Sequence, residues 1–264
     1  MRHETFTLDE RYPEATLTTY IQDEVKNHPP RPAMIVCPGG GYHDLAPHEG
    51  EPFALYYLNE GFNTFMLHYG VSENASGGRP LIQAALAIKH VREHAESYHV
   101  DPDKIFIIGF SAGGHLAASA GIFWNAPIVR EALGITEETE GINRPNGMIL
   151  SYPVISAMEY RHKGSFRYLL GTGSEEPTEE ARRAWSLELH VDSSTPSAFI
   201  WHTVNDQVVP VQNSLLLADA MTRAGVSYEM HLFPDGHHGL GLAKNRPDVA
   251  VWTSLSVTWT KNCL

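Results

Sequence analysis

Short runs of apolar residues alternate along the chain with longer segments in which apolar residues recur at helical spacing. Continuously apolar runs of this length are typical of parallel β-strands that helices cover on both faces. We expect six such strands, at residues 33–37, 62–67, 104–109, 147–152, 197–202 and 228–233. Residues 14–22 alternate between apolar and polar side chains instead, which predicts an antiparallel edge strand.

The longer segments between these strands carry the signals of helix ends. Pro80 and Pro210 stand where helices are expected to begin, and Gly61 and Gly225 stand where helices are expected to end. The expected helices are residues 51–61, 79–98, 112–124, 210–225 and 247–261. This alternation predicts an α/β fold with a mostly parallel central sheet and helices on both faces. The irregular residues 156–195 are expected to cover part of the rim of the sheet.

Composition narrows the class of protein. The chain has 264 residues, of which 42% are hydrophobic, and we interpret it as a single domain spanning residues 1–264. Its net charge of −12 argues against a nucleic-acid partner. No apolar segment reaches the length of a signal peptide or a membrane span, so we expect a cytoplasmic protein with no membrane partner. Cys37 and Cys263 form neither a disulfide framework nor a zinc pattern. A single sequence does not decide the oligomeric state, so a homo-oligomer stays an open alternative.

The segment "GFSAGG", residues 109–114, is the clearest chemical signal. It follows a predicted strand and opens a predicted helix, which is the context that a G-x-S-x-G nucleophile elbow requires. Gly109 and Gly113 allow close approach of the backbone in a tight turn, and the helix N-terminus behind Ser111 favours developing negative charge. We therefore predict that Ser111 is a catalytic nucleophile. The spacing fits neither a dinucleotide-binding loop nor a P-loop.

The segment "CPGGGYH", residues 37–43, follows another predicted strand with three consecutive glycines. Such a loop can aim several backbone N–H groups at one point, as acyl transfer requires for its oxyanion. In α/β hydrolases one donor comes from this loop and another from the residue after the nucleophile. We predict an oxyanion hole formed by Gly40, Gly41 and Ala112.

The acid of a Ser-His-Asp triad is expected after the nucleophile and before the histidine. Asp206 comes just after the predicted strand 197–202, at the same sheet edge as the elbow. Asp192 precedes that strand and Asp219 falls within a helix pattern, so both lie at less favourable positions. Asp235 is too close to the histidines in sequence to be the usual partner. Asp206 is therefore the predicted acid.

The base must come after the last predicted strand, where "PDGHHGLGLA" (residues 234–243) holds His237 and His238. The spacing matches no zinc motif, and adjacent residues in an extended loop point in opposite directions, so only one imidazole can reach Ser111. The pattern alone leaves His237 and His238 undecided.

Several motifs together are similar to those of a known family. They are "CPGGGY", "HEGEP", "HVDPDKIFIIGFSAGGHLAAS", "SYPVIS", "GSFRYLLG", "WHTVNDQVVPVQNSLLLADAM" and "HLFPDGHHGLGLA", and they cover nearly the whole chain from residue 33 onward. The chain resembles the bacterial acetyl-xylan-esterase-like and feruloyl-esterase-like α/β hydrolases, which are related more distantly to hormone-sensitive-lipase-type esterases. Pro38 stands where related lipases and esterases often carry the histidine of an HGGG motif.

The resemblance implies roles for particular residues. The family's base is the histidine directly before the Gly-Leu-Gly run, which is His238 here, while His237 occupies a position that is often glycine. The family's acid falls on Asp206, although Asn205 replaces the first residue of the usual "DDxVVP". The resemblance also implies a small or absent lid and activity on short acyl esters, often acetyl groups on plant sugars.

Residues and resemblance together predict a serine carboxylesterase for short-chain acyl esters, with acetyl esters on carbohydrates such as xylo-oligosaccharides as the expected substrates. A general short-chain or feruloyl esterase is one alternative, and a catalytically inactive binding protein of the same fold is another. We expect a small-molecule ester partner, with no cofactor and no metal. A prolyl-oligopeptidase-type peptidase would need a propeller domain, and a metal-dependent deacetylase would need clustered ligands. In the pocket, Tyr42 and Val208 are predicted to face the substrate.

Overall fold

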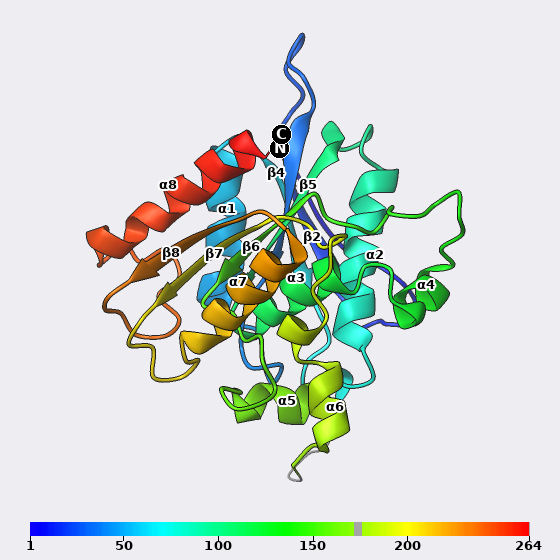
Figure 1. The fold of residues 1–264 in the computed structure, drawn as a ribbon. Coiled ribbons are helices and arrows are strands. Elements are labelled where there is room, and N and C mark those ends of the chain that lie inside the picture. Colours follow the sequence, from blue (N-terminus) through cyan, green and yellow to red (C-terminus); the bar gives the residue numbers. More distant parts are fainter. Residues whose placement is uncertain (172–175, 264) are drawn as a thin grey trace.

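An eight-stranded sheet forms the centre of the computed structural model, which describes residues 1–171 and 176–263 (Figure 1). The strands are β1 (Arg2–Thr7), β2 (Thr16–Ile21), β3 (Arg31–Cys37), β4 (Asn63–His68), β5 (Val100–Phe110), β6 (Gly147–Ser151), β7 (Ala198–Thr203) and β8 (Tyr228–Phe233). The helices are α1 (Glu51–Asn59), α2 (Arg79–Glu93), α3 (Ala112–Ile122), α4 (Pro127–Leu133), α5 (Lys163–Leu169), α6 (Glu179–Ala184), α7 (Gln212–Ala224) and α8 (Pro247–Asn262), with short 3₁₀ helices η1 (Pro47–Glu49), η2 (Ser72–Asn74) and η3 (Leu187–Leu189). The spatial order of the strands is β1-β2-β4-β3-β5-β6-β7-β8.

The strands from β3 to β8 pair in parallel, which confirms the six predicted parallel strands and their mostly parallel sheet. Strand β2 is antiparallel to β4 as predicted, but the expectation that it forms the edge is wrong. Strand β1 pairs along the outer side of β2 and is itself the edge. Its residues are mostly exposed and polar, so no apolar pattern marks it in the sequence.

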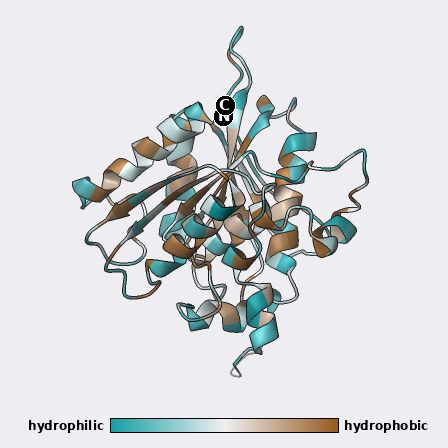
Figure 2. Ribbon diagram, in the orientation of Figure 1, coloured by the Kyte–Doolittle hydropathy of each residue, from teal (hydrophilic) through white to brown (hydrophobic). Residues whose placement is uncertain are grey.

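Two separate cores lie on the two faces of the sheet, because successive side chains of a strand point in opposite directions. Ile35 and Ile107 face a core shared with helices α2, α3 and α7. Val36 and Ile108 face the other core, which is shared with α1 and α8. Figure 2 shows hydrophobic residues along the strands and mixed hydropathy on the surrounding helices. Helices therefore cover both faces, as the sequence predicts.

The five predicted helices all form, but some of their ends differ from the expectation. Helix α2 ends at Glu93, and residues 94–99 turn back to enter β5. Helix α7 begins at Gln212, directly after its N-cap residue Val211. It ends at Ala224, and the next residue, Gly225, adopts the left-handed conformation. No helix in the described part of the chain has both the length and the apolar character needed to cross a bilayer.

The loops that follow β3, β5, β7 and β8 meet at one edge of the sheet, where parallel strands place their carboxyl ends. Within the predicted rim segment 156–195, α5 and α6 lie beyond this edge, at the bottom of Figure 1. Residues 172–175 of that segment lie outside the described residues. Helix α5 supplies part of the wall of the pocket described below.

Candidate active site

Ser111 lies on the sharp turn between β5 and α3. Its backbone has φ 53° and ψ −116°, a conformation that costs free energy in a residue other than glycine and that neighbouring structure must hold in place. The turn needs glycines on both sides. A Cβ on Gly109 would lie 2.0 Å from the Gly113 carbonyl oxygen, and one on Gly113 would lie 2.2 Å from that of Cys37. The sequence folds locally as the predicted elbow, and Ser111 lines a pocket.

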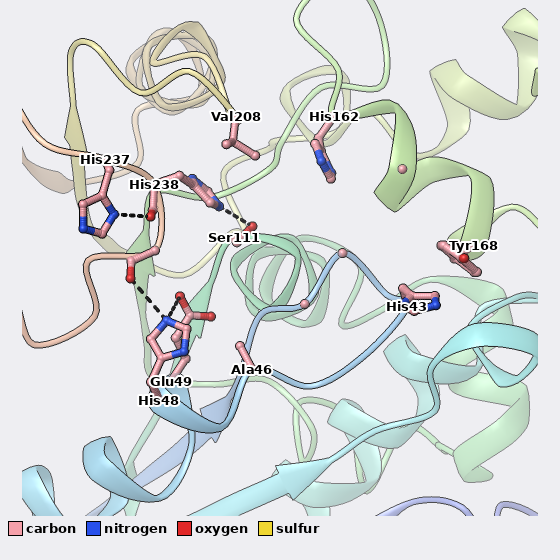
Figure 3. A pocket seen from close by; sticks show the side chains of 14 residues that line it. His43, Ala46, His48, Glu49, Ser111, His162, Tyr168, Val208, His237 and His238 are labelled. Atoms are coloured by element: carbon pink, nitrogen blue, oxygen red, sulfur yellow. Dashed lines mark hydrogen bonds and ion pairs between the residues drawn. The ribbon is translucent and has the colours of Figure 1, made fainter.

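His238 and Asp206 complete a hydrogen-bonded chain with Ser111. His238 Nδ1 lies 2.6 Å from Asp206 Oδ2. His238 Nε2 lies 2.8 Å from Ser111 Oγ (Figure 3). A carboxylate can only accept, so Nδ1–H donates to Asp206 and leaves Nε2 to accept the serine hydroxyl proton. This is the arrangement in which an imidazole can remove a proton from a nucleophile. The structure thus brings together the three residues that were predicted separately.

Besides His238, three further polar groups hold the carboxylate of Asp206. Its Oδ1 accepts the N–H groups of Val208 (2.8 Å) and Val209 (3.0 Å), while His202 Nε2 lies 3.4 Å from Oδ2. Burial alone would raise the pKa of Asp206, but hydrogen bonds from His202 and His238 outweigh it and leave the pKa well below its usual range. Asp206 therefore stays ionised beside His238. His202 lies buried in β7 and also supports this carboxylate.

His237 and His238 point in different directions, as adjacent residues of an extended loop should. His237 is exposed, and its Nδ1–H donates to the carbonyl oxygen of His238 at 2.7 Å, which turns its ring away from Ser111 (Figure 3). Asn205 steadies the same loop, since its side-chain oxygen accepts the N–H of Gly236 at 2.9 Å. Asn205, which replaces the first aspartate of the family's "DD", thus supports the histidine loop, and the carboxylate of Asp206 is retained.

The glycine loop after β3 lies against the nucleophile. Gly40 (φ 125°) and Gly41 (φ 69°) both line the pocket, and a Cβ on Gly40 would lie 2.0 Å from the Asp44 carbonyl oxygen. Among the described residues, no acceptor pairs with the N–H groups of Gly40, Gly41 or Ala112. Ala112 is the first residue of α3 and directly follows Ser111. Three unpaired donors therefore lie in the two segments that frame Ser111.

A pocket of about 630 Å³ opens around Ser111. It is lined by Gly40, Gly41, His43, Ala46, His48, Glu49, Ser111, His162, Gly164, Tyr168, Val208, His237, His238 and Gly239. Imidazoles are the most frequent polar groups on its walls. Val208 reaches the pocket as predicted, with 48% of its surface exposed.

His162 presents a defined donor to this pocket. Its Nδ1 accepts the backbone N–H of Ser165 (3.3 Å) and lies 2.8 Å from the hydroxyl of the same serine, so it caps α5. Burial lowers the pKa of His162, which favours a neutral ring. With Nδ1 accepting, the proton of the neutral ring lies on Nε2. The ring points into the pocket in Figure 3.

Tyr42 does not face the pocket, contrary to the prediction. It is 1% exposed and belongs to the core. Its hydroxyl lies 2.9 Å from His115 Nδ1, and His115 Nε2–H donates to the Trp185 carbonyl at 3.1 Å. Burial lowers the pKa of His115 to about 4, which keeps that ring neutral and able to accept from Tyr42. The residue after the glycine loop thus anchors the loop in the core.

Several residues at the site went unassigned in the sequence interpretation, and two of them lie directly beside the catalytic groups. Glu49, from "HEGEP", is buried and lines the pocket, and Tyr152, from "SYPVIS", packs its ring against His238 at a centroid distance of 5.0 Å. Both lie in quoted motifs, so the signal was present, but no spacing rule connects them to the catalytic loops. In residues 1–171 and 176–263, no group of three or more His, Cys, Asp or Glu side chains is arranged so that it could hold a metal ion.

The BD-FAE family model matches residues 18–221. The chain is 39% identical over 226 residues to an endo-1,4-beta-xylanase B of Butyrivibrio fibrisolvens, covering 84% of this chain and 34% of that protein. It is 32% identical over 216 residues to an acetylxylan esterase of Xylanibacter ruminicola, covering 79% of this chain and 41% of that protein. The chain therefore spans well under half the length of these two curated relatives.

The fold is also similar to a solved structure, that of an acetyl ester-xyloside bifunctional hydrolase from Caldicellulosiruptor lactoaceticus. The TM-score is 0.82 at 39% sequence identity, and the match covers 94% of this chain and 88% of that one. The similarity thus extends over nearly the whole chain.

Proposed function

The chain belongs to the BD-FAE family of α/β hydrolases, and from this premise we propose that it is a serine carboxylesterase that hydrolyses short-chain acyl esters. The observation that carries the proposal is the chain of hydrogen bonds from Asp206 through His238 to Ser111, at 2.6 Å and 2.8 Å, in a pocket open to a small molecule. The names of the relatives, which include an acetylxylan esterase, support the same class of reaction.

The proposed reaction has two halves. His238 Nε2 takes the hydroxyl proton of Ser111 as Oγ attacks the ester carbonyl, and the N–H groups of Gly40, Gly41 and Ala112 stabilise the oxyanion. The imidazolium then gives its proton to the leaving alkoxide, which departs as the alcohol. In the second half His238 deprotonates a water that attacks the acyl-enzyme, and the proton returns to Ser111 as the acid leaves. Asp206 orients the imidazole throughout.

The polar groups of the pocket favour an uncharged alcohol with hydroxyl groups. Among the described residues, no lysine or arginine lines the pocket, so it holds no permanent cation for an anionic substrate. The neutral imidazole of His162 and the hydroxyl of Tyr168 offer hydrogen bonds that a sugar could accept or donate. We therefore propose acetyl groups on carbohydrates, such as xylo-oligosaccharides, as the preferred esters.

Hydrolysis of the glycosidic bond itself fits the pocket less well. Most glycosidases use two carboxyl groups on opposite sides of the scissile bond. Of the described residues that line this pocket, Glu49 alone carries a carboxylate, and both its oxygens accept hydrogen bonds from the protein. The similarity to a protein named as a xylanase therefore does not bring xylanase activity to this pocket.

The test compares the wild type with Ser111→Ala on p-nitrophenyl acetate, butyrate and octanoate and on acetylated xylo-oligosaccharide. We expect the rate to fall with acyl length, acetate to be released from the sugar, and Ser111→Ala to lower kcat by at least about 10⁴-fold. Ser254→Ala is the matched control, because that hydroxyl only bonds the backbone of its own helix.

Three results would reject the proposal. One is Ser111→Ala turnover equal to that of the wild type. Another is inhibition by a chelator but not by a serine-directed phosphonate, which would favour metal-dependent deacetylation. The third is absence of activity on every ester, which would favour the inactive binding protein.

A further inference from the structure

A buried carboxylate lies beside the proposed active site without a strong cationic partner. Glu49 is 2% exposed at the end of η1, and the one basic side chain within 4.0 Å of it among the described residues is the exposed imidazole of His48, with Nε2 3.7 Å from Oε1. Burying a carboxylate is costly unless hydrogen bonds compensate. Two donors compensate here: one belongs to the glycine loop, and the other, Tyr152, is hydrogen-bonded to the histidine loop.

The first donor belongs to the glycine loop. Glu49 Oε2 accepts the N–H of Gly39 at 2.9 Å. A Cβ on Gly39 would lie 2.4 Å from that oxygen and 3.1 Å from Ser111 Cβ, so this glycine is wedged between the carboxylate and the nucleophile. Because Gly39 directly precedes Gly40 and Gly41, this bond sets the position of the N–H groups proposed to bind the oxyanion.

The second donor leads to the histidine loop. The hydroxyl of Tyr152 donates to Glu49 Oε1 at 2.7 Å and accepts the N–H of Gly241 at 3.1 Å. The ring of the same tyrosine packs edge-on against His238, at 68° between planes. Burial, followed by the neighbouring Glu49 carboxylate, raises the pKa of Tyr152 well above its usual range, so the phenol keeps its proton.

A weaker contact spans the same gap at the rim of the pocket. His48 Nε2–H donates to the Gly239 carbonyl at 3.2 Å while the same ring lies beside Glu49 (Figure 3). The glycine loop, η1 and the histidine loop thus meet around one carboxylate, although Gly239 of the histidine loop lies 191 residues after His48.

We propose that Glu49 is a positioning residue that fixes the oxyanion loop and the His238 loop relative to each other. Its hydrogen bonds go to Gly39 and Tyr152 and not to Ser111, Asp206 or His238. It acts through Gly39 on one side and through Tyr152 on the other. This inference rests on the proposed esterase function and deepens it, because it assigns a role at the same site to a residue outside the triad.

The chemistry requires a carboxylate at this position. Gly39 N–H and Tyr152 O–H are both donors aimed at Glu49, so the partner must present two acceptors. A glutamine presents one acceptor and one donor. Glu49→Gln can therefore keep the bond to Gly39 but leaves the hydroxyl proton of Tyr152 without its acceptor.

The experiment is a double-mutant cycle of Glu49→Gln and Tyr152→Phe, with p-nitrophenyl acetate as substrate. Rates are normalised to the concentration of reactive Ser111, titrated with a serine-directed phosphonate, so that unfolded protein does not count. We expect each single variant to lower kcat by about tenfold with KM within about twofold, since loss of a hydrogen bond to a charged group misplaces the catalytic loops. The double variant should be no slower than the slower single variant, because both changes remove the same link.

The chain offers a matched control in the same motif. The hydroxyl of Tyr20 donates to Glu51 Oε1 at 3.1 Å, a tyrosine–glutamate pair of the same chemistry that does not line the pocket. Glu51→Gln and Tyr20→Phe should keep kcat within about twofold of the wild type. Full multiplicative losses in the Glu49 and Tyr152 cycle would overturn the proposal, as would wild-type kcat per titrated site in Glu49→Gln.

Failure of this inference can be told from failure of the proposed function. If the wild type hydrolyses acetate esters, Ser111→Ala does not, and Glu49→Gln matches the wild type, only the positioning role is lost. If the wild type hydrolyses no ester, the proposed function itself fails.

Discussion

The two sides of the pocket are built differently. One side comes from the segments that follow β3, β5 and β8 and is mostly buried; we call it the catalytic wall (Ser111, Glu49, His238). The other side comes from α5 and the loop after β7 and is half-buried or exposed; we call it the outer wall (His162, Tyr168, Val208). Side chains of the catalytic wall are tied by hydrogen bonds to other loops, whereas Val208 is 48% exposed.

This difference indicates a division of labour. Groups that several bonds fix from behind can hold the geometry that bond making requires. Groups that the protein holds from one side alone still have hydrogen-bond donors or apolar surface available for a ligand. We therefore expect changes in the catalytic wall to lower kcat, and changes in the outer wall to alter KM and the choice of alcohol.

The largest effect expected in this comparison comes from the support of the catalytic wall. Asp206→Asn keeps the shape of the side chain but places an amide where His238 needs an acceptor, so the imidazole takes the wrong tautomer. We expect kcat to fall by about 10³- to 10⁴-fold with KM little changed. Steady-state kinetics on p-nitrophenyl acetate measures it.

The control for that variant is Asp192→Asn. Asp192 is the competing acid of the sequence interpretation, and its Oδ1 accepts only local groups of Ser194. It should keep activity within about twofold of the wild type. If Asp192→Asn were the inactive variant and Asp206→Asn the active one, the assignment of the acid would be wrong.

The ionised state of Asp206 also predicts a pH dependence of stability. The folded-state pKa lies below the unfolded value because hydrogen bonds from the two histidines outweigh burial. A depressed pKa contributes stability above the unfolded pKa, and this contribution is lost as the pH falls towards the folded value. Urea unfolding of the wild type and of Asp206→Asn should therefore show a difference that shrinks below about pH 4. A difference that grows on acidification would contradict this sign.

The smallest effect is expected in the outer wall. His162→Asn preserves an N-cap acceptor for Ser165 but removes the ring from the pocket. We expect KM for acetylated xylo-oligosaccharide to rise by about three- to tenfold, as for loss of one hydrogen bond, with kcat within about twofold. Because burial lowers the pKa of His162, the change in KM should be the same at pH 7 and pH 8.

A matched variant on the same wall sharpens that result. Val208→Ala removes only apolar surface, so it should change KM by no more than about threefold and should not distinguish a sugar ester from p-nitrophenyl acetate. A loss of kcat in His162→Asn as large as that in Asp206→Asn would remove the distinction between the walls.

The sequence predicted the parallel part of the fold well, because buried parallel strands leave continuous apolar runs and helices leave proline and glycine at their ends. It missed β1, whose exposed polar residues carry no pattern and whose pairing depends on β2 being in place. It extended α2 through residues 94–98, where the helical periodicity continues after the chain has begun to turn towards β5.

For the site, motif spacing predicted the geometry now seen for Ser111 and Asp206, because the elbow and the strand ends are local features. The choice between His237 and His238 depended on family resemblance, since local sequence does not say which ring faces the serine. Tyr42 was placed wrongly because its neighbours in sequence line the pocket, while its own partner, His115, lies 73 residues away. Contacts between segments that are distant in sequence produce no regular residue spacing from which they could be predicted.

The most direct test of the account is covalent labelling of the proposed nucleophile. The protein is treated with one equivalent of a serine-directed phosphonate, and intact mass and peptide mapping locate the adduct as residual esterase activity is followed. The account predicts one adduct per chain, on Ser111, with activity lost in proportion and no adduct on Ser111→Ala. An adduct on another residue, or full labelling of Ser111 with esterase activity retained, would contradict it.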